Sequence, residues 1–134
     1  MVTKAYPGSP DQADLSRADS LAREVFSDIA NKWALLIIET IGDRTARFGT
    51  LRDGVEGISH KMLTQNLRML ERNGLVVRTV HPVVPPRVEY TLTEAGQALR
   101  VTIDGMCAWT HQYLAHIETA RRHFATDRPD GSPR

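Results

Sequence analysis

Apolar positions in the first third of the chain recur at the spacing of a helix and predict two helices. Either Asp19 or Ser20 is the candidate N-cap of the first helix. The second covers residues 32–41 and stops at Gly42. Because it has little polar face, we expect it at the centre of the core. The apolar positions of the first helix are Leu21, Val25, Phe26 and Ile29.

Two further helices follow, and the second of them has clear boundary signals. A short helix is expected at about residues 48–55. The fourth helix begins after Ser59, a good N-cap, and continues to Asn73, with Gly74 as the residue that ends it. Its core-facing stripe is Leu63, Leu67 and Leu70.

After the fourth helix the apolar pattern changes to the shorter period of a strand. Residues 75–80 and 88–92 predict the two strands of a hairpin. The tip between them contains three prolines, which stiffen it and prevent it from pairing at a sheet edge. Thr93 and Glu94 then begin a long helix that extends to about Phe124. This order predicts a mostly α fold with a small β-hairpin, the winged helix-turn-helix.

Length and composition bound the organisation of the chain. Its 134 residues predict one winged helix-turn-helix domain over residues 15–125, with a flexible arm at residues 1–14 and a flexible tail at residues 126–134. No apolar run is long enough to span a bilayer, and no signal peptide is recognisable. The single cysteine excludes an internal disulfide framework, so we expect a cytoplasmic protein.

Charge is concentrated in the middle of the chain. Residues 44–87 hold eight basic and three acidic residues, a net charge of +5, whereas the rest carries nine basic and thirteen acidic residues, or −4. A basic segment in a nearly neutral protein favours a localised anionic partner such as DNA.

The fourth helix offers side chains that suit a DNA major groove. Gln65 can pair with adenine, and Lys61 or Arg68 with guanine or a phosphate. Thr64 can touch a thymine methyl group, and Ser59 can offer its hydroxyl to a phosphate at the helix N-terminus. Each could equally be part of a solvated helix face. The outward-facing residues are His60, Lys61, Thr64, Gln65 and Arg68.

Three more residues flank this helix in the basic segment. Arg87, beside the proline tip, is expected in a minor groove or on its phosphates, and the alternative is an ion pair with Glu89. Arg47, before the third helix, can clamp a phosphate or simply be solvated. His81 can contact a phosphate, but an exposed imidazole without a partner is favoured for it, and Trp33 is expected to be a core residue.

Other function classes find less support. The sequence has no Gly-rich phosphate loop, nucleophile motif or metal-spaced cluster, so we expect no enzyme activity, cofactor or metal. The main alternative is a winged helix that binds another protein, because a fold does not fix a function.

Four motifs stand out along the predicted elements. They are residues 30–38 (ANKWALLII), 47–51 (RFGTL), 57–71 (GISHKMLTQNLRMLE) and 84–96 (VPPRVEYTLTEAG). These motifs resemble the HxlR-type group of bacterial regulators, which is related to MarR-type proteins. In order, they are similar to its Gly-x-Lys-Trp-x-Leu-x-Ile signature, the start of its helix-turn-helix, its recognition helix, and its wing with the entry of its last helix. The resemblance covers about Ser20 to Ala115.

The resemblance implies a homodimer joined through its N- and C-terminal helices, often a repressor, on a near-palindromic DNA operator. Several members sense oxidants through a Cys-Pro pair before the first helix, but the corresponding positions here are Ser20 and Leu21. A serine forms no thiolate, so thiol switching at this position is excluded. Cys107 is expected to be a small buried residue of the core or a dimer seam, with a sensor as the less favoured alternative. An unknown small-molecule effector is a further candidate partner.

Overall fold

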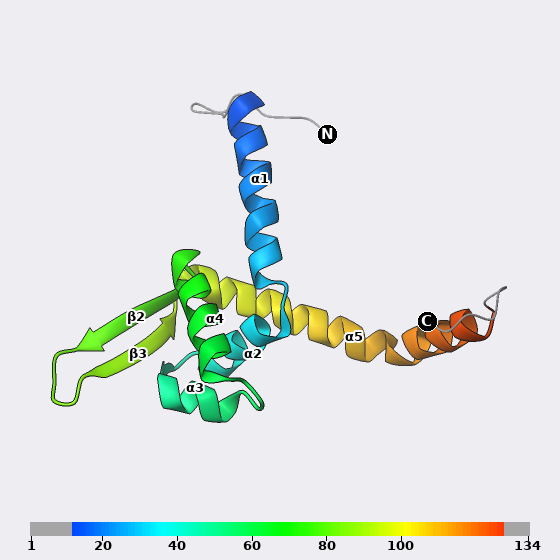
Figure 1. Cartoon of the computed structure of the whole chain (residues 1–134). Coiled ribbons are helices and arrows are strands. Elements are labelled where there is room, and N and C mark those ends of the chain that lie inside the picture. Colours follow the sequence, from blue (N-terminus) through cyan, green and yellow to red (C-terminus); the bar gives the residue numbers. More distant parts are fainter. Residues whose placement is uncertain (1–11, 128–134) are drawn as a thin grey trace. The chain divides into compact units, whose positions relative to one another are not determined.

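The computed structural model describes residues 12–127 and shows five helices and three strands there. Figure 1 labels most of them and colours them in chain order. The elements are α1 (Gln12–Ile29), α2 (Lys32–Ile41), β1 (Thr45–Arg47), α3 (Phe48–Gly54), α4 (His60–Arg72), β2 (Val76–His81), β3 (Arg87–Leu92) and α5 (Glu94–Thr126). This is the predicted fold class, a mostly helical winged helix-turn-helix with a small antiparallel sheet.

The chain divides into two compact units between Gln97 and Ala98. The first unit holds every element from α1 to β3 together with the first turn of α5. The second unit is the rest of α5, which is 33 residues long in all. Within residues 12–127, no helix combines the length and the apolar character that a membrane span needs.

The core of the first unit is built from α2, α3 and α4. As predicted, α2 lies at its centre, because one whole face of this helix is inaccessible to solvent. The stripe predicted for α4 is also buried. Such apolar burial is the dominant stabilising term in a domain of this size. The largest fully buried side chains are Ile37, Ile38, Ile41, Leu51, Val55, Leu63, Leu67 and Leu70.

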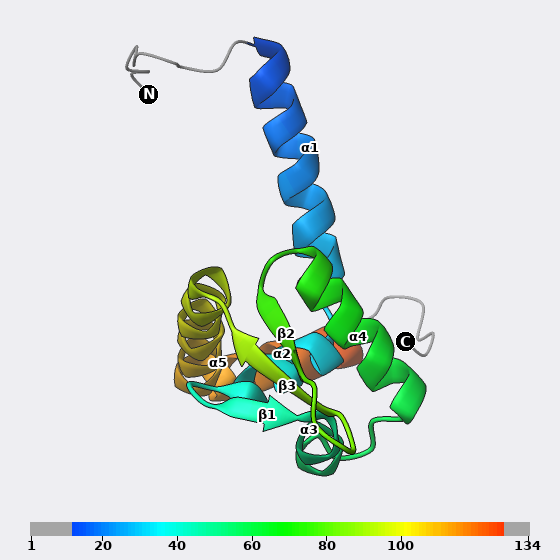
Figure 2. The ribbon, with the colours of Figure 1, turned by 90° about the vertical axis from the view of Figure 1, so that its left-hand side faces the viewer.

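The three strands form one antiparallel sheet in the order β1-β3-β2 (Figure 2). Side chains alternate between its two faces, as they must in a strand. Ala46, Val76, Tyr90 and Leu92 are buried on one face. The sequence did not predict β1, because three residues are too few to establish an alternating pattern.

Local signals place α4 as predicted. The Oγ of Ser59 accepts a hydrogen bond from the backbone N–H of Met62 at 3.1 Å and so caps the helix. Gly74 follows the helix with φ of +72°, a left-handed conformation that favours glycine.

Glycine has a low helix propensity, and the junction of β3 with α5 explains why Gly96 nevertheless stands in the first turn of α5. Thr93 Oγ1 accepts from the N–H of Gly96 at 3.1 Å and donates to the carbonyl of Gly74 at 2.7 Å. A Cβ atom at Gly96 would stand 2.2 Å from the carbonyl oxygen of Leu75. The first turn of α5 therefore packs on the end of α4 only if this residue has no side chain.

The N-terminal boundary of α1 differs from the prediction. Asp19 and Ser20 lie inside α1, which includes Gln12, so neither is its N-cap and the predicted arm of residues 1–14 ends in a helix. No proline or glycine interrupts residues 12–29, and good helix formers there extend the helix beyond its apolar stripe. Residues 1–11 and 128–134, which hold the rest of the predicted arm and almost all of the predicted tail, lie outside the described residues.

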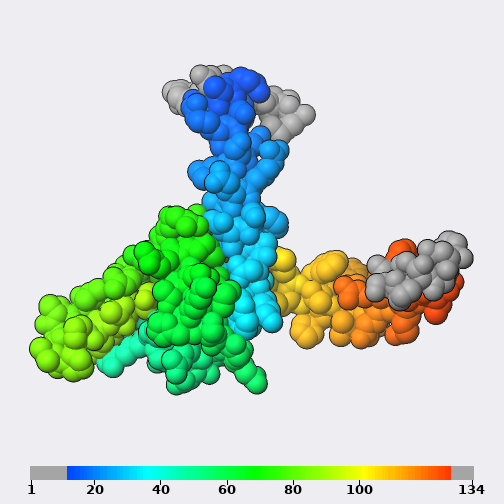
Figure 3. Space-filling view, viewed as in Figure 1, coloured from blue at the N-terminus to red at the C-terminus, as the bar shows by residue number. Residues whose placement is uncertain are grey.

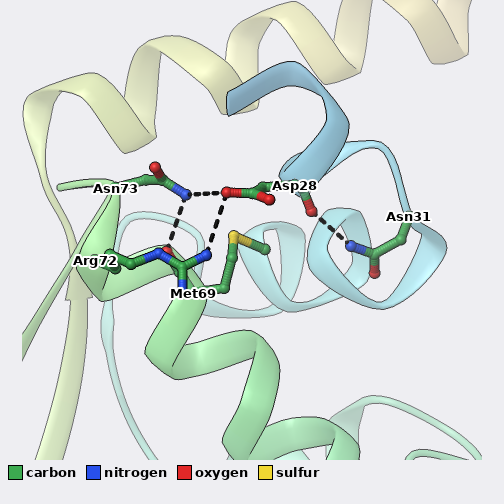
Figure 4. A network of polar contacts seen from close by, with 5 residues as sticks. All are labelled: Asp28, Asn31, Met69, Arg72 and Asn73. Carbon is green, nitrogen blue, oxygen red and sulfur yellow. Dashed lines mark hydrogen bonds and ion pairs between the residues drawn. The ribbon is translucent and has the colours of Figure 1, made fainter. Parts of the chain in front are cut away.

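α1 has no buried residue, and it stands out from the rest of its unit in the space-filling view (Figure 3). Polar contacts at its C-terminal end join it to α4 (Figure 4). Asp28 Oδ2 accepts from Arg72 Nη2 at 3.3 Å and from Asn73 Nδ2 at 3.2 Å. The side chain of Asn31 donates to the Asp28 carbonyl at 2.9 Å and caps α2 through the N–H of Ala34. Asp28 therefore links the ends of three helices.

Candidate nucleic-acid interface

The outer face of α4 is polar and open to solvent. His60, Lys61, Gln65 and Arg68 are exposed, while Thr64 is half-buried. The opposite face of the helix is in the core, so these side chains have one fixed direction relative to the body. A helix held in this way can enter a major groove with its N-terminal half leading.

The N-terminal end of α4 is braced by an aromatic contact. The rings of His60 and Phe48 lie 4.8 Å apart between centroids, at 50° to one another. His60 thus joins the start of the predicted recognition helix to the start of α3. Ser59 uses its oxygen as the helix cap, and its hydroxyl hydrogen is left to donate to an acceptor such as a phosphate.

A hollow of about 420 Å³ lies between α4 and the hairpin. Its rim carries Thr64, Arg68, Glu71 and Arg78, so a predicted contact of α4 shares it with an arginine of β2. The apolar part of its lining is Phe48, Leu67 and Tyr90. Guanidinium groups from two elements beside one hollow suit a phosphate group.

The hairpin forms a wing whose tip carries apolar side chains. Val84 is fully exposed there. A second hollow, of about 520 Å³, is lined by the tip and by the residues that precede and begin α3. It brings Arg47 and Arg87 together, although they are forty residues apart in the sequence. The two predicted arginines of the wing region therefore belong to one site.

Glu89 lies among the basic groups of the wing. Its Oε1 is 2.6 Å from Nε2 of His81, and its Oε2 is 3.6 Å from Nε of Arg87. The hydrogen bond from His81, together with the charges of His81, Arg87 and Arg47, lowers the pKa of Glu89 below its ordinary value of 4.5. Glu89 is therefore ionised at neutral pH.

These contacts correct one prediction and resolve another. His81 was expected to be without a partner, but it is half-buried and bonded to Glu89, because the register of the hairpin brings both to one face. The ion pair given as the alternative for Arg87 is present. It does not exclude a role in DNA binding, since the Arg87 side chain is 40% exposed.

Two residues were not predicted for this interface. Arg78 was counted only as one charge of the basic segment, and Glu89 only as an ion-pair partner. The signal that could have found Arg78 is its place two residues after buried Val76, which puts both on one face of a strand beside the fourth helix. The contacts of Glu89 with His81 and Arg87 come from the hairpin itself, whereas its neighbour Arg47 lies on β1, which the sequence did not reveal.

Two other predicted positions lie apart from these hollows. Ser20 and Leu21 are exposed within α1, and Cys107 is an exposed free cysteine of α5. The prediction that Cys107 is a core residue is therefore wrong, because its side chain is on an uncovered side of the helix. A dimer seam there stays a prediction. Trp33 is half-buried rather than fully in the core, with Lys32 Nζ 4.6 Å from its ring centroid.

The fold and this surface define a winged helix-turn-helix regulator, and comparison with known proteins agrees. The chain belongs to the HxlR-like helix-turn-helix family, whose family model matches residues 28–118. YodB, an HTH-type transcriptional regulator of Bacillus subtilis strain 168, is 41% identical over 94 residues, which are 70% of this chain and 84% of YodB.

Solved structures show the same relationship. The redox regulator HypR in its reduced form matches with a TM-score of 0.66 at 33% identity, over 74% of this chain and 98% of HypR. A transcriptional regulator from Enterococcus faecalis V583 assigned to the MarR family matches with a TM-score of 0.65 at 32% identity, over 87% of this chain and 99% of that one. The chain is thus a transcriptional regulator with a helix-turn-helix domain, and its relatives are regulators rather than enzymes.

Proposed function

We propose that this regulator is a repressor that binds a near-palindromic operator as a homodimer. In this proposal α4 enters the major groove, and the wing near Arg87 meets the minor groove or the phosphate backbone. The observation that carries it is the outer face of α4, which presents Lys61, Gln65 and Arg68 while the opposite face is fixed in the core. A rigid helix with exposed donors is what base readout requires.

Each predicted side chain has a role that fits its place. Gln65 reads adenine, and Lys61 contacts guanine or a phosphate near the N-terminal end of α4. Arg68 and Arg78 hold a phosphate beside the first hollow, which Thr64 also lines. Arg47 and Arg87 serve the second hollow in the same way. Ser59 and His60 contact the backbone at the start of α4.

A second candidate is a winged helix that binds another protein. The observation in its favour is the apolar surface of the wing, where Val80 and Val83 are about half exposed and Val84 is fully exposed. The two candidates differ in their dependence on salt. Contacts with six to ten phosphates lose about 10³ to 10⁵ in affinity between 50 and 200 mM salt, because bound counterions are released. A mainly apolar protein interface is much less sensitive.

The experiment is a titration of the protein with its own upstream DNA at several salt concentrations. We expect tight binding at low salt and a steep loss as salt increases. Selection of the bound sequence from a random library then gives the operator, and its symmetry tests the homodimer. If no DNA is bound at 50 mM salt by a folded preparation, the repressor proposal fails and the protein-binding alternative takes its place.

The signal that releases the operator is also a proposal. We propose that it is a small molecule and that it does not act on a thiol at position 20, because this position within α1 is a serine. HypR is described as a redox regulator, but position 20 of this chain offers no thiol for such a role. A screen for compounds that release the selected operator tests the proposal.

A further inference from the structure

One face of the wing sheet collects several charged and titratable side chains. In the register of β3, Glu89 pairs with Arg47 on one side and with Thr79 on the other, and Arg87 pairs with His81. Residues paired across strands, and residues two apart in one strand, share a face. Arg47, Arg87 and His81 therefore surround Glu89 on the face opposite to buried Tyr90.

The two oxygens of Glu89 serve two different partners. Oε1 takes the hydrogen bond of His81 at 2.6 Å, which fixes the plane of the carboxylate. Oε2 faces Nε of Arg87 at 3.6 Å. Nε of Arg87 is buried and makes no hydrogen bond among the described residues, so this ion-pair contact is its one described polar neighbour. The Arg87 side chain is 40% exposed, so part of its guanidinium is open to solvent.

We propose that Glu89 is a positioning residue for DNA binding, which holds Arg87 through Nε and leaves its two terminal amino groups for a phosphate. A guanidinium binds a phosphate through two parallel donors, and a group already held in place loses less freedom on binding. His81 anchors the carboxylate from its other side. The inference rests on the proposed function, because it assigns Arg87 to DNA.

The Glu89 carboxylate could either neutralise its neighbours or position Arg87. These two roles predict opposite effects on operator affinity when the carboxylate is removed. If Glu89 only neutralises its neighbours, then Glu89→Gln adds a net positive charge and strengthens binding to every DNA. If Glu89 positions Arg87, the substitution frees the guanidinium and weakens binding to the operator. Non-specific DNA, which needs no fixed geometry, is then bound equally well or better.

The experiment compares Glu89→Gln, Arg87→Ala and the double variant on the selected operator and on a scrambled fragment. Glu56→Gln is the matched control, because it removes one exposed carboxylate of the basic segment outside the wing. We expect Glu89→Gln to lower operator affinity about fivefold to tenfold without lowering the affinity for the scrambled fragment. In the Arg87→Ala background the same change should have no further effect. Glu56→Gln should lower neither affinity.

A second measurement needs no DNA. The Arg87 Nε–H signal in an NMR spectrum, assigned by its loss in Arg87→Ala, should be protected from solvent exchange in the parent protein and lose this protection in Glu89→Gln. If the signal is unprotected in the parent, or if Glu89→Gln strengthens binding to both the operator and the scrambled fragment, the positioning role is refuted. If Glu89→Gln lowers operator affinity equally in the parent and in the Arg87→Ala background, the positioning role is also refuted. The substitution then has a general effect on the wing. If the parent binds no DNA, the proposed function fails as well, whatever the NMR signal shows.

Discussion

At the scale of single residues, Ser59 and His60 serve the fold before they can serve DNA. Ser59 caps α4 with its oxygen, and His60 packs against Phe48. Both contacts fix the end of α4 that would lead into a major groove. Residues farther along the exposed face have no comparable structural task, and they are the better candidates for base readout.

Gln65 is the residue for which base readout can be tested most directly. It is exposed on α4, so Gln65→Ala should leave the free energy of unfolding nearly unchanged. We expect it to alter base preference at one position per half-site, with a loss of about 1–3 kcal/mol on the preferred base. Arg87→Ala should instead weaken binding to all sequences about equally. Affinities for operators with single base changes give the answer, and an equal loss for every sequence in Gln65→Ala would remove the assignment.

Glu89 gives the wing a defined response to acid. The bond from His81 and the nearby arginines lower its pKa from 4.5, so its contribution to stability is complete above that value and is lost as pH falls through the lowered pKa. Glu89→Gln should therefore unfold at a lower temperature than the parent at pH 5.5. The difference should shrink towards pH 3. Thermal unfolding at both values measures this, and a difference that does not change with pH would show that the charge of Glu89 is not the cause.

Cys107 is exposed on α5 and is the only thiol of the chain. We expect Cys107→Ser to leave operator release unchanged, because the residues that flank it, Met106 and Ala108, carry no charge that would activate a thiol. The check is release of operator DNA by an oxidant from the parent and from the variant. A response that disappears in Cys107→Ser would make Cys107 a sensor.

At the scale of elements, the sequence was informative where one element carries a complete pattern. α2 and α4 have continuous apolar stripes, and α4 also has a cap and a terminal glycine, so their bounds could be predicted closely. β1 has only three residues, and it forms because β3 offers it a partner far away in the sequence. The Arg87–Glu89 pair could be foreseen from the hairpin, but the place of Arg47 beside Glu89 could not, since Arg47 reaches it only through β1.

The contacts of Asp28 allow a test of how α1 is held. α1 buries no residue, so its polar contacts to Arg72 and Asn73 should contribute much of its attachment to α4. Because the ion pair is partly exposed, we expect Asp28→Ala to cost only about 1 kcal/mol of unfolding free energy. Hydrogen exchange should increase in α1 and at the end of α4, and remain slow in α2.

The control for this test is Glu24→Ala, which removes a carboxylate from the exposed part of the same helix. It should change neither the free energy of unfolding nor exchange at the end of α4. If Asp28→Ala and Glu24→Ala behave alike, the contacts in Figure 4 contribute nothing measurable to the position of α1.

At the scale of the whole molecule, the terminal helices carry apolar surface that the described chain leaves open. On α1 these residues are Leu15, Leu21 and Phe26. On α5 they are Val101, Met106, Trp109, Tyr113, Leu114 and Phe124. Apolar surface of this extent on two helices favours association with another copy, although the contacts of a dimer were beyond prediction from one chain.

Trp109 is the best place to test the homodimer, because it is 57% exposed and its ring lies 5.9 Å from that of Tyr113. If a partner covers this face, Trp109→Glu places a charge in an apolar seam and should produce monomers at micromolar concentration. A monomer binds one half-site without the benefit of the second, so operator affinity should fall by about 10² or more while affinity for a single half-site is retained. Ala115→Glu adds the same charge six residues on, on a different side of α5, and should remain dimeric. Sedimentation measures the oligomeric state of both variants. If Trp109→Glu is dimeric and binds the operator normally, the dimer contact lies elsewhere.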